Sequence, residues 1–300
     1  MKKTLFSLGA GIASLTAVGL LFTNKIIYIK KKSDDTILHR ELSEGRFTLE
    51  EFNHLNKDTI TIPSKFGYSI QGWFVKATND KRFMIISHGV TMNKINSIKY
   101  MKLFLSRGWN VVVYDHRSHG ESGGKTTSYG FYEKFDLQSV VSWIKNQYGD
   151  ESVIGIHGES MGAVTTLLYA GMVEDGADFY IVDCPFSDFK DQLKYLLKKD
   201  YNLPPFPVLP IANQLLKLRE GYRMEDVSPI TVIKNIKNPV LFIHSAKDDY
   251  ILPEMTKKLF ELKEGPKKLF IAKNGNHAYS FGENKEEYES IIDQFLDEIL

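Results

Sequence analysis

The stretch Ser152–Ala163 constrains the fold of this chain more than any other part of the sequence. A short apolar run ends in Gly158-Glu159-Ser160-Met161-Gly162, and a helix-compatible run of small residues follows at once. So short a turn between a strand and a helix forces Ser160 into a strained conformation, and glycine at 158 and 162 removes side chains that would collide. We therefore expect the Ser160 hydroxyl to stand clear at the carboxyl edge of a sheet, beside the N–H groups of a helix N-terminus.

The composition is that of an ordinary globular protein. The chain has 300 residues, of which 43% are apolar and 25% charged, enough for a sizeable core in one large domain or two small ones. Its net charge of +1 gives no reason to expect a nucleic acid as partner. Cys184 is the only cysteine, which excludes an intramolecular disulfide and a zinc site built from several cysteines. We expect no metal and no cofactor, because no cluster of ligand residues has metal-binding spacing.

The N-terminal segment has the composition of a membrane anchor. After two lysines comes an apolar run, Leu5–Phe22, about as long as a bilayer requires. Thr23–Lys32 is aromatic and basic and offers no small-x-small cleavage site, so we favour an uncleaved single-pass anchor in the cell membrane over a cleaved signal peptide. Lysines on both sides of the run leave its orientation open. We expect residues 1–32 to be an anchor with basic flanks, 33–57 a tether or helical lead-in, and 58–300 the folded domain.

Runs with strand and helix spacing alternate from residue 58 onward. The runs at 59–62 and 68–75 predict an antiparallel strand pair. Further strands are expected at 82–87, 109–114, 153–156, 179–182, 240–243 and 268–272, and helices at 97–105, 135–148, 253–262 and 285–300. This order predicts an α/β fold, with a mostly parallel eight-stranded sheet and helices on both faces. A proline-rich stretch, about 186–227, breaks the rhythm and is expected to form a small cap over the sheet.

Residues suited to nucleophilic catalysis follow Ser160 along the chain. A serine hydroxyl needs a base to take its proton, and the base needs an acid to fix its tautomer. His277 lies in a glycine-bearing loop past the last expected strand, from which its ring can reach back to Ser160. The loop after His244 contains Asp248 and Asp249, which gives the chain order Ser, Asp, His that this architecture uses.

Taken together, these motifs resemble the α/β-hydrolase superfamily over about residues 58–300. The features that match, in order, are His88-Gly89, Asp115-x-Arg117-x-x-Gly120, Gly158-x-Ser160-x-Gly162, the acid loop after His244, and Gly275-x-His277. The chain is similar to the membrane-anchored bacterial hydrolases that are grouped with serine aminopeptidase-like and monoacylglycerol-lipase-like esterases. The resemblance implies an α/β-hydrolase fold with a cap insertion.

The same resemblance implies roles for individual residues. Ser160 is the expected nucleophile, His277 the general base and Asp248 the acid that orients it. Family acid loops place the carboxylate four residues after the strand-ending residue, which favours Asp248 over its neighbour Asp249. Asp183, at the end of another strand, is a third candidate for the acid, although a structural role is the simpler interpretation.

An oxyanion hole is expected from backbone N–H groups at two positions. These are the N–H of Met161, directly after the nucleophile, and the N–H of Val90, after the third strand. His88 is expected to brace the loop that carries Val90 rather than to react. Three other histidines near the matching motifs are also expected to be structural: His116, His119 and His157.

The expected activity is two-step acyl transfer to water from carboxylic esters, small or with an acyl chain, without a cofactor. The expected partners are thus a small-molecule or lipid-like ester and, through the anchor, the membrane. Several cap residues either offer a surface to an acyl chain or simply pack the cap on the core: Phe189, Tyr195, Leu196, Tyr201, Phe206 and Leu209. Two alternatives stay open. One is a peptidase or amidase, in which Glu159 would bind a free amine, and the other is a membrane-tethered binding protein without turnover.

Overall fold

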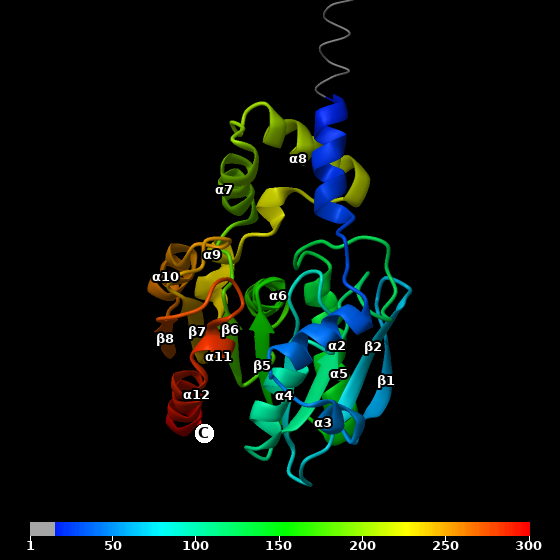
Figure 1. Ribbon diagram of the computed structural model, residues 1–300, viewed down its shortest axis with the longest axis vertical. Coiled ribbons are helices and arrows are strands. Elements are labelled where there is room, and N and C mark those ends of the chain that lie inside the picture. Colours follow the sequence, from blue (N-terminus) through cyan, green and yellow to red (C-terminus); the bar gives the residue numbers. More distant parts are fainter. Residues whose placement is uncertain (1–15) are drawn as a thin grey trace, which may run out of the picture.

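The computed structural model describes residues 16–300, and its centre is one eight-stranded sheet (Figure 1). The strand order is β1-β2-β4-β3-β5-β6-β7-β8, in which β2 pairs antiparallel with β1 and β4 and the other five pairings are parallel. The strands are β1 (Asp58–Pro63), β2 (Ser69–Val75), β3 (Arg82–Ser87), β4 (Asn110–Tyr114), β5 (Val153–Glu159), β6 (Phe179–Asp183), β7 (Val240–Ser245) and β8 (Lys267–Ala272). The predicted mostly parallel, eight-stranded sheet is confirmed.

Burial explains why the strands have different sequence patterns. The central strand β4 is buried at every residue and is a continuous apolar run, Val111-Val112-Val113, because helices cover both of its faces. Strand β1 lies at the sheet edge, and its burial alternates, with Ile60 and Ile62 inward. The apolar content of each strand therefore reports how many of its faces are covered.

Helices cover both faces of the sheet and enclose two apolar cores. One core lies under α5 (Glu133–Tyr148), α6 (Met161–Leu168) and α10 (Pro253–Leu262). The other core lies under α4 (Ile98–Leu105) and α12 (Lys285–Ile299), with the short α11 (Ser280–Glu283) before it. The helices expected at 97–105, 135–148, 253–262 and 285–300 are confirmed, with ends shifted by one to two residues.

The stretch after β6 forms a helical cap above the carboxyl ends of the strands (Figure 1). Its elements are α7 (Phe189–Tyr201), α8 (Val208–Glu220) and η2 (Met224–Asp226), after which α9 (Pro229–Val232) and η3 (Ile233–Asn235) lead back to β7. Asn202, directly after α7, has a left-handed φ of 50°, and Gly221, directly after α8, has a φ of 80°. The cap is thus built mainly from two helices, each followed by a residue with left-handed backbone.

Residues 16–27 form a helix that packs on this cap. Its Ile26 and Ile27 are buried in a third apolar core, together with Leu209 and Leu216 of α8. Among residues 16–300, no helix is both long enough and apolar enough to cross a membrane. Residues 1–15, which hold most of the apolar run Leu5–Phe22, lie outside the described part. The anchor therefore stays a prediction, but residues 16–27 are attached to the folded domain rather than separate from it.

The lead-in also packs on the domain. Residues 33–57 contain α2 (Asp34–Ser43) and α3 (Leu49–Asn53). Ile37 and Phe47 are buried in the core beneath α4 and α12, so this segment is a helical lead-in with its own anchoring side chains. Helix α2 brings Arg40 to the carboxyl edge of the sheet, where it lines a cavity beside Ser160.

Candidate active site

Ser160 occupies a strained turn between β5 and α6. Its φ is 55° and its ψ is −113°, a conformation that residues with a side chain rarely adopt. A Cβ at Gly158 would lie 2.5 Å from the carbonyl oxygen of Gly162. A Cβ at Gly162 would overlap the carbonyl oxygen of Ser87, at the end of β3. Glycine is thus required at both positions, and at 162 the crowding neighbour is the adjacent strand, which the sequence pattern did not identify.

The structure brings Ser160, His277 and Asp248 together. The distance from Ser160 Oγ to His277 Nε2 is 2.8 Å, and that from His277 Nδ1 to Asp248 Oδ2 is 2.7 Å. The three residues follow β5, β8 and β7, so they meet because parallel strands present their carboxyl ends at one edge. With the ionised carboxylate accepting from Nδ1–H, Nε2 is free to accept the serine proton.

The two rival carboxylates are engaged elsewhere. Asp249 is 75% exposed and forms an ion pair with Lys199 of the cap, 2.8 Å away. Asp183 is buried and accepts hydrogen bonds from the hydroxyls of Ser280 and Tyr288, the latter at 3.2 Å. Asp248 is therefore the carboxylate that contacts His277, while Asp183 takes the structural role expected of it.

The Asp248 carboxylate is held by more partners than the sequence indicated. Its Oδ1 accepts the backbone N–H groups of Tyr250 and Ile251, at 2.9 and 3.0 Å, and its Oδ2 lies 3.1 Å from His244 Nε2. Burial would raise the pKa of Asp248, but hydrogen bonds from His244 and His277 hold this pKa well below its usual range. Sequence reasoning used His244 only as a strand end, and the i, i+4 spacing to Asp248 was the available signal.

The candidate oxyanion donors lie at the two expected positions. Met161 is the first residue of α6, so its N–H is one of the helix donors without an intrahelical partner. Val90 lines both cavities that border Ser160. The positive end of the α6 dipole adds to the favourable potential for an anion at this point.

Buried neutral histidines brace the loop that carries Val90. His88 Nε2 accepts the N–H of His116 at 3.0 Å, so its Nδ1 carries the proton and donates to the carbonyl oxygen of Gly89 at 2.8 Å. His119 Nε2 accepts the N–H of Thr91 at 3.3 Å. Burial lowers the pKa of His88 and of His119 to about 4, so both rings are neutral at pH 7. These histidines fix backbone, as expected.

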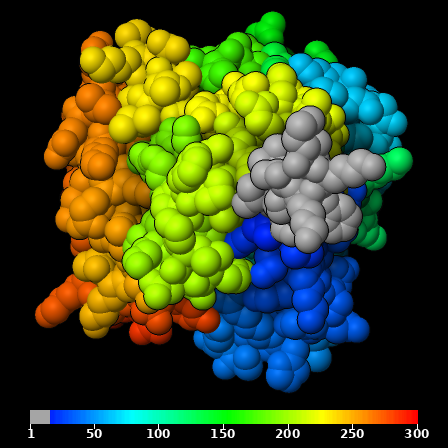
Figure 2. Space-filling model, turned by 90° about the horizontal axis from the view of Figure 1, so that it is seen from above, coloured from blue at the N-terminus to red at the C-terminus, as the bar shows by residue number. Residues whose placement is uncertain are grey.

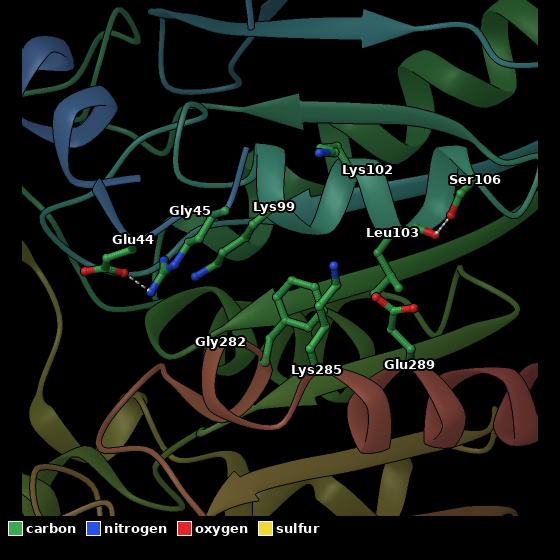
Figure 3. A pocket seen from close by; sticks show the side chains of 11 residues that line it. Glu44, Gly45, Lys99, Lys102, Leu103, Ser106, Gly282, Lys285 and Glu289 are labelled. Atoms are coloured by element: carbon green, nitrogen blue, oxygen red, sulfur yellow. Dashed lines mark hydrogen bonds and ion pairs between the residues drawn. The ribbon is translucent and has the colours of Figure 1, made fainter. Parts of the chain in front are cut away.

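Glu159, directly before Ser160, is buried and already paired. Its Oε2 lies 2.5 Å from Lys99 Nζ and accepts the hydroxyl of Tyr100 at 2.8 Å. Burial would raise the pKa of Glu159, but the charge of Lys99 and these hydrogen bonds lower it to about 2. On its other side Lys99 lines a charged cavity of about 270 Å³ between α4 and α12, which also contains Lys102 and Lys285 (Figure 3).

One group of potential metal ligands includes Asp248 and His277. Among residues 16–300, ligand atoms of Cys184, Asp248 and His277 lie within 4.8 Å of one another. Burial raises the pKa of the Cys184 thiol well above its usual range, so the sulfur is a neutral thiol and a poor metal ligand. Asp248 and His277 are already bonded to each other, so these residues do not fit a metal centre.

Two cavities of different character meet at Ser160. The first, about 50 Å³, lies under the cap and is mainly apolar; its lining residues are Val90, Tyr129, Ser160, Met161, Phe186, Phe189, Gln192, Leu193, Leu196, Tyr250 and Ile251. The second, about 300 Å³, is more polar and is bordered by His277, Glu159 and the cationic side chains of Lys32 and Arg40. An ester carbonyl at Ser160 would thus have an apolar side and a charged side.

Comparison with known proteins agrees with this geometry. A family model described as alpha/beta hydrolase fold matches residues 83–221. Over 298 residues, 99% of this chain and 98% of the relative, the sequence is 54% identical to the uncharacterized protein YqkD of Bacillus subtilis (strain 168). The chain belongs to the α/β-hydrolase family. The family and fold predicted from the motifs are confirmed.

Two further comparisons are with proteins that are named as enzymes. This hydrolase is 28% identical over 200 residues to the lysophosphatidylserine lipase ABHD12 of Mus musculus. The aligned region covers 61% of this chain but only 50% of the mouse protein. The chain therefore spans about half the length of that lipase. The esterase Pf2001 of Pyrococcus furiosus superposes with a TM-score of 0.67 and 22% identity, over 84% of this chain and 96% of the esterase, which supports the fold alone.

Proposed function

We propose that the protein is a serine hydrolase that cleaves carboxylic esters through an acyl-enzyme. The observation that carries the proposal is the hydrogen-bonded chain from Ser160 through His277 to Asp248, with distances of 2.8 and 2.7 Å. Ser160 Oγ attacks the ester carbonyl while His277 Nε2 takes its proton. The tetrahedral intermediate then expels the alcohol, which receives that proton from His277. Water, deprotonated by His277, attacks the acyl-enzyme and releases the acid and free Ser160.

The surroundings of the triad favour the charged species of this reaction. Asp248 is ionised at neutral pH and faces the imidazolium that forms on His277. The N–H groups of Met161 and Val90 would face the oxyanion, and each such donor lowers the barrier by roughly 3 kcal/mol. No step needs a group that the chain does not supply.

The state of Glu159 favours an ester over a peptide substrate. A peptidase that recognises a free amino terminus needs an unpaired carboxylate near the nucleophile, whereas Glu159 is buried and neutralised by Lys99. Alkoxides also leave more readily than amines. The name of the mouse relative, a lipase, agrees with ester chemistry.

The two cavities at Ser160 support an amphiphilic ester as substrate. The apolar cavity suits an acyl group. The more polar cavity contains Lys32, Arg40 paired with Glu44, and the Glu159 carboxylate, and it suits a polar alcohol. A lysophosphatidylserine, the substrate in the mouse relative's name, combines these two features, so it belongs in the first substrate panel together with a monoacylglycerol.

We also propose that the chain is anchored in the cell membrane. The apolar run Leu5–Phe22 supports this. Helix 16–27 and the cap lie at one end of the molecule (Figure 1), and both have large apolar side chains that are exposed. Leu21 is 63% exposed, Phe206 76% and Leu218 81%. The full chain should stay in a carbonate-washed membrane pellet, whereas a chain without residues 2–15 should be released. Release of the full chain would contradict the anchor.

A fluorophosphonate probe tests the catalytic proposal directly. The wild-type chain should be labelled and should hydrolyse p-nitrophenyl butyrate, and Ser160→Ala should lose both properties while it keeps its melting temperature. A folded wild type that is neither labelled nor active would favour a binding protein. A wild type that cleaves matched amides as fast as esters would favour the peptidase. Labelling that survives Ser160→Ala would mean that another residue is the nucleophile.

A further inference from the structure

We propose that the helix of residues 16–27 is part of the substrate site, where it forms with α7 the outer wall of an acyl-chain channel that starts at Ser160. The inference rests on the proposed ester hydrolysis and adds a substrate class, esters with an acyl chain longer than the cavity at Ser160 can hold. It also gives residues 16–27 a role in chain-length selection. The evidence is a third cavity, which borders the apolar cavity at Ser160.

This third cavity, called the outer cavity below, has a volume of about 210 Å³ and lies between helix 16–27 and the cap. Its lining residues come from both elements and from two loops beside the triad: Phe22, Lys25, Ile26, Tyr129, Leu193, Leu196, Leu197, Asp200, Tyr201, Leu209 and Tyr250. Most of these side chains are aliphatic or aromatic, as in sites that take apolar ligands. The described N-terminal residues lie directly against the yellow-green residues of the cap when the molecule is seen from above (Figure 2).

The cavity at Ser160 and the outer cavity are neighbours. Four residues line both of them, namely Tyr129, Leu193, Leu196 and Tyr250. Leu193 and Leu196 are three residues apart on α7, so they share one face of the helix, and both are half-buried. These shared residues form a neck between the two cavities. An acyl chain that starts at Ser160 and passes the neck enters the space beside helix 16–27.

Contacts between helix 16–27 and α7 close the outer wall. The ring of Phe22 meets Tyr201 edge to face, with centroids 5.5 Å apart. Lys25 Nζ donates to the Tyr201 hydroxyl at 2.8 Å and lies 4.6 Å from the centre of its ring. The polar tip of Lys25 is thus engaged with Tyr201, while its methylene stem borders the cavity. Ile26, one turn along the same face, is 7% exposed and completes the wall.

The position of the outer cavity suits a substrate that comes from a bilayer. Leu20 and Leu21 of the same helix are exposed, Leu20 on the face opposite Phe22 and Leu21 at its side. The apolar run continues from there toward Leu5. Residues 16–32 contain four lysines and no acidic residue, which favours an anionic lipid surface. An acyl tail that leaves this surface meets the outer cavity before it reaches Ser160.

Chain-length profiles of variants in the full chain test the channel. The substrates are p-nitrophenyl butyrate, octanoate, laurate and palmitate, with the enzyme in detergent micelles. Ile26→Trp fills the outer cavity and excludes the distal methylenes of a long acyl chain from it. Each substrate methylene that is no longer buried lowers kcat/KM about four-fold. The ratio of kcat/KM for laurate to that for butyrate should therefore fall at least about ten-fold. Phe22→Ala enlarges the cavity and should raise the palmitate-to-octanoate ratio about three-fold or more. Leu21→Trp, on the exposed face of the same helix, is the matched control and should keep the wild-type profile.

The two variants change the cavity in opposite directions, so a folding defect in one does not decide the result. Fluorophosphonate labelling of Ser160 checks that each variant has a competent site. Opposite shifts in the two profiles, with no shift in Leu21→Trp, would support the channel. Wild-type profiles in both variants would overturn the channel and leave ester hydrolysis standing. A wild type without Ser160-dependent ester hydrolysis would overturn both proposals.

Discussion

His244 Nε2 lies 3.1 Å from Asp248 Oδ2, the same oxygen that binds His277. His244 is fully buried, and its Nδ1 lies 2.7 Å from the hydroxyl of Thr256 on α10. The orientation of the Asp248 carboxylate is therefore set by His244 as well as by His277. Such support holds a carboxylate in one position before any substrate binds.

Asp248→Asn should remove most of the activity. Asparagine keeps the shape of the side chain but loses the charge that fixes the His277 tautomer and stabilises the imidazolium. A change of this kind costs about 10⁴-fold in kcat. Initial rates on p-nitrophenyl butyrate, with active sites counted by a fluorophosphonate probe, measure the loss.

Asp249→Asn is the matched control for that change, because it alters the adjacent residue in the same way. Asp249 is exposed and pairs with Lys199, and surface ion pairs of this kind contribute at most about 1 kcal/mol to stability. Its kcat should stay within about two-fold of wild type. If Asp249→Asn proved the more damaging of the two, the acid would be wrongly assigned.

His244→Asn should lower kcat without an equal effect on KM. His244 Nε2 is shared between the Asp248 carboxylate, at 3.1 Å, and the carbonyl oxygen of Ile251, at 2.8 Å. A hydrogen bond to a charged group is worth about 1.5–3 kcal/mol, so a kcat loss of roughly ten-fold is expected. Initial rates over a range of p-nitrophenyl butyrate concentrations, with active sites counted by a fluorophosphonate probe, separate kcat from KM. A kcat equal to that of wild type would contradict a positioning role for His244.

The sequence predicted which three residues meet at the sheet edge, because strand ends and glycine-bearing turns follow from local physical requirements. Gly158 and Gly162 are required by backbone crowding, and a parallel sheet places Ser160, Asp248 and His277 at one edge whatever the loops do. The sequence did not predict which side chains support those residues from a distance. His244 reaches Asp248 only because the loop after β7 folds back on its own strand.

The N-terminal helix shows the limit of hydropathy as evidence. Leu5–Phe22 is apolar throughout, and apolarity indicates removal from water without saying whether lipid or protein replaces it. In the described part of this run, Gly19 packs against Ile211 and Phe22 against Tyr201, whereas Leu21 faces outward. One stretch of sequence thus has a protein-facing side and an exposed side, which a hydropathy window averages together.

The free energy of unfolding should fall as the pH is lowered from 7 toward 4.5. Burial lowers the pKa of His88 and His119 to about 4 and that of His157 to about 3, below the usual value of 6.5. The unfolded chain therefore binds more protons in this window, and each histidine costs on the order of 2 kcal/mol. Burial raises the pKa of Asp136 to about 6 and also raises that of Asp183, so these two groups act in the opposite direction. Burial lowers the pKa of His116 well below its usual value, which makes four histidines against two carboxyl groups. Urea unfolding midpoints at several pH values measure the sum, and a midpoint that rose on acidification would contradict it.

Gly162→Ala should prevent the hydrolase from folding, whereas Gly282→Ala should be nearly neutral. A Cβ at 162 would overlap the carbonyl of Ser87, and neither backbone can move without separating β3 from α6. Gly282, in α11, has its nearest neighbours 3.9 Å from an added Cβ. The yield of soluble protein and the melting temperature compare the two variants. A soluble Gly162→Ala with the melting temperature of wild type would show that the turn at Ser160 has room, and the argument that strain and crowding position the hydroxyl would be lost with it.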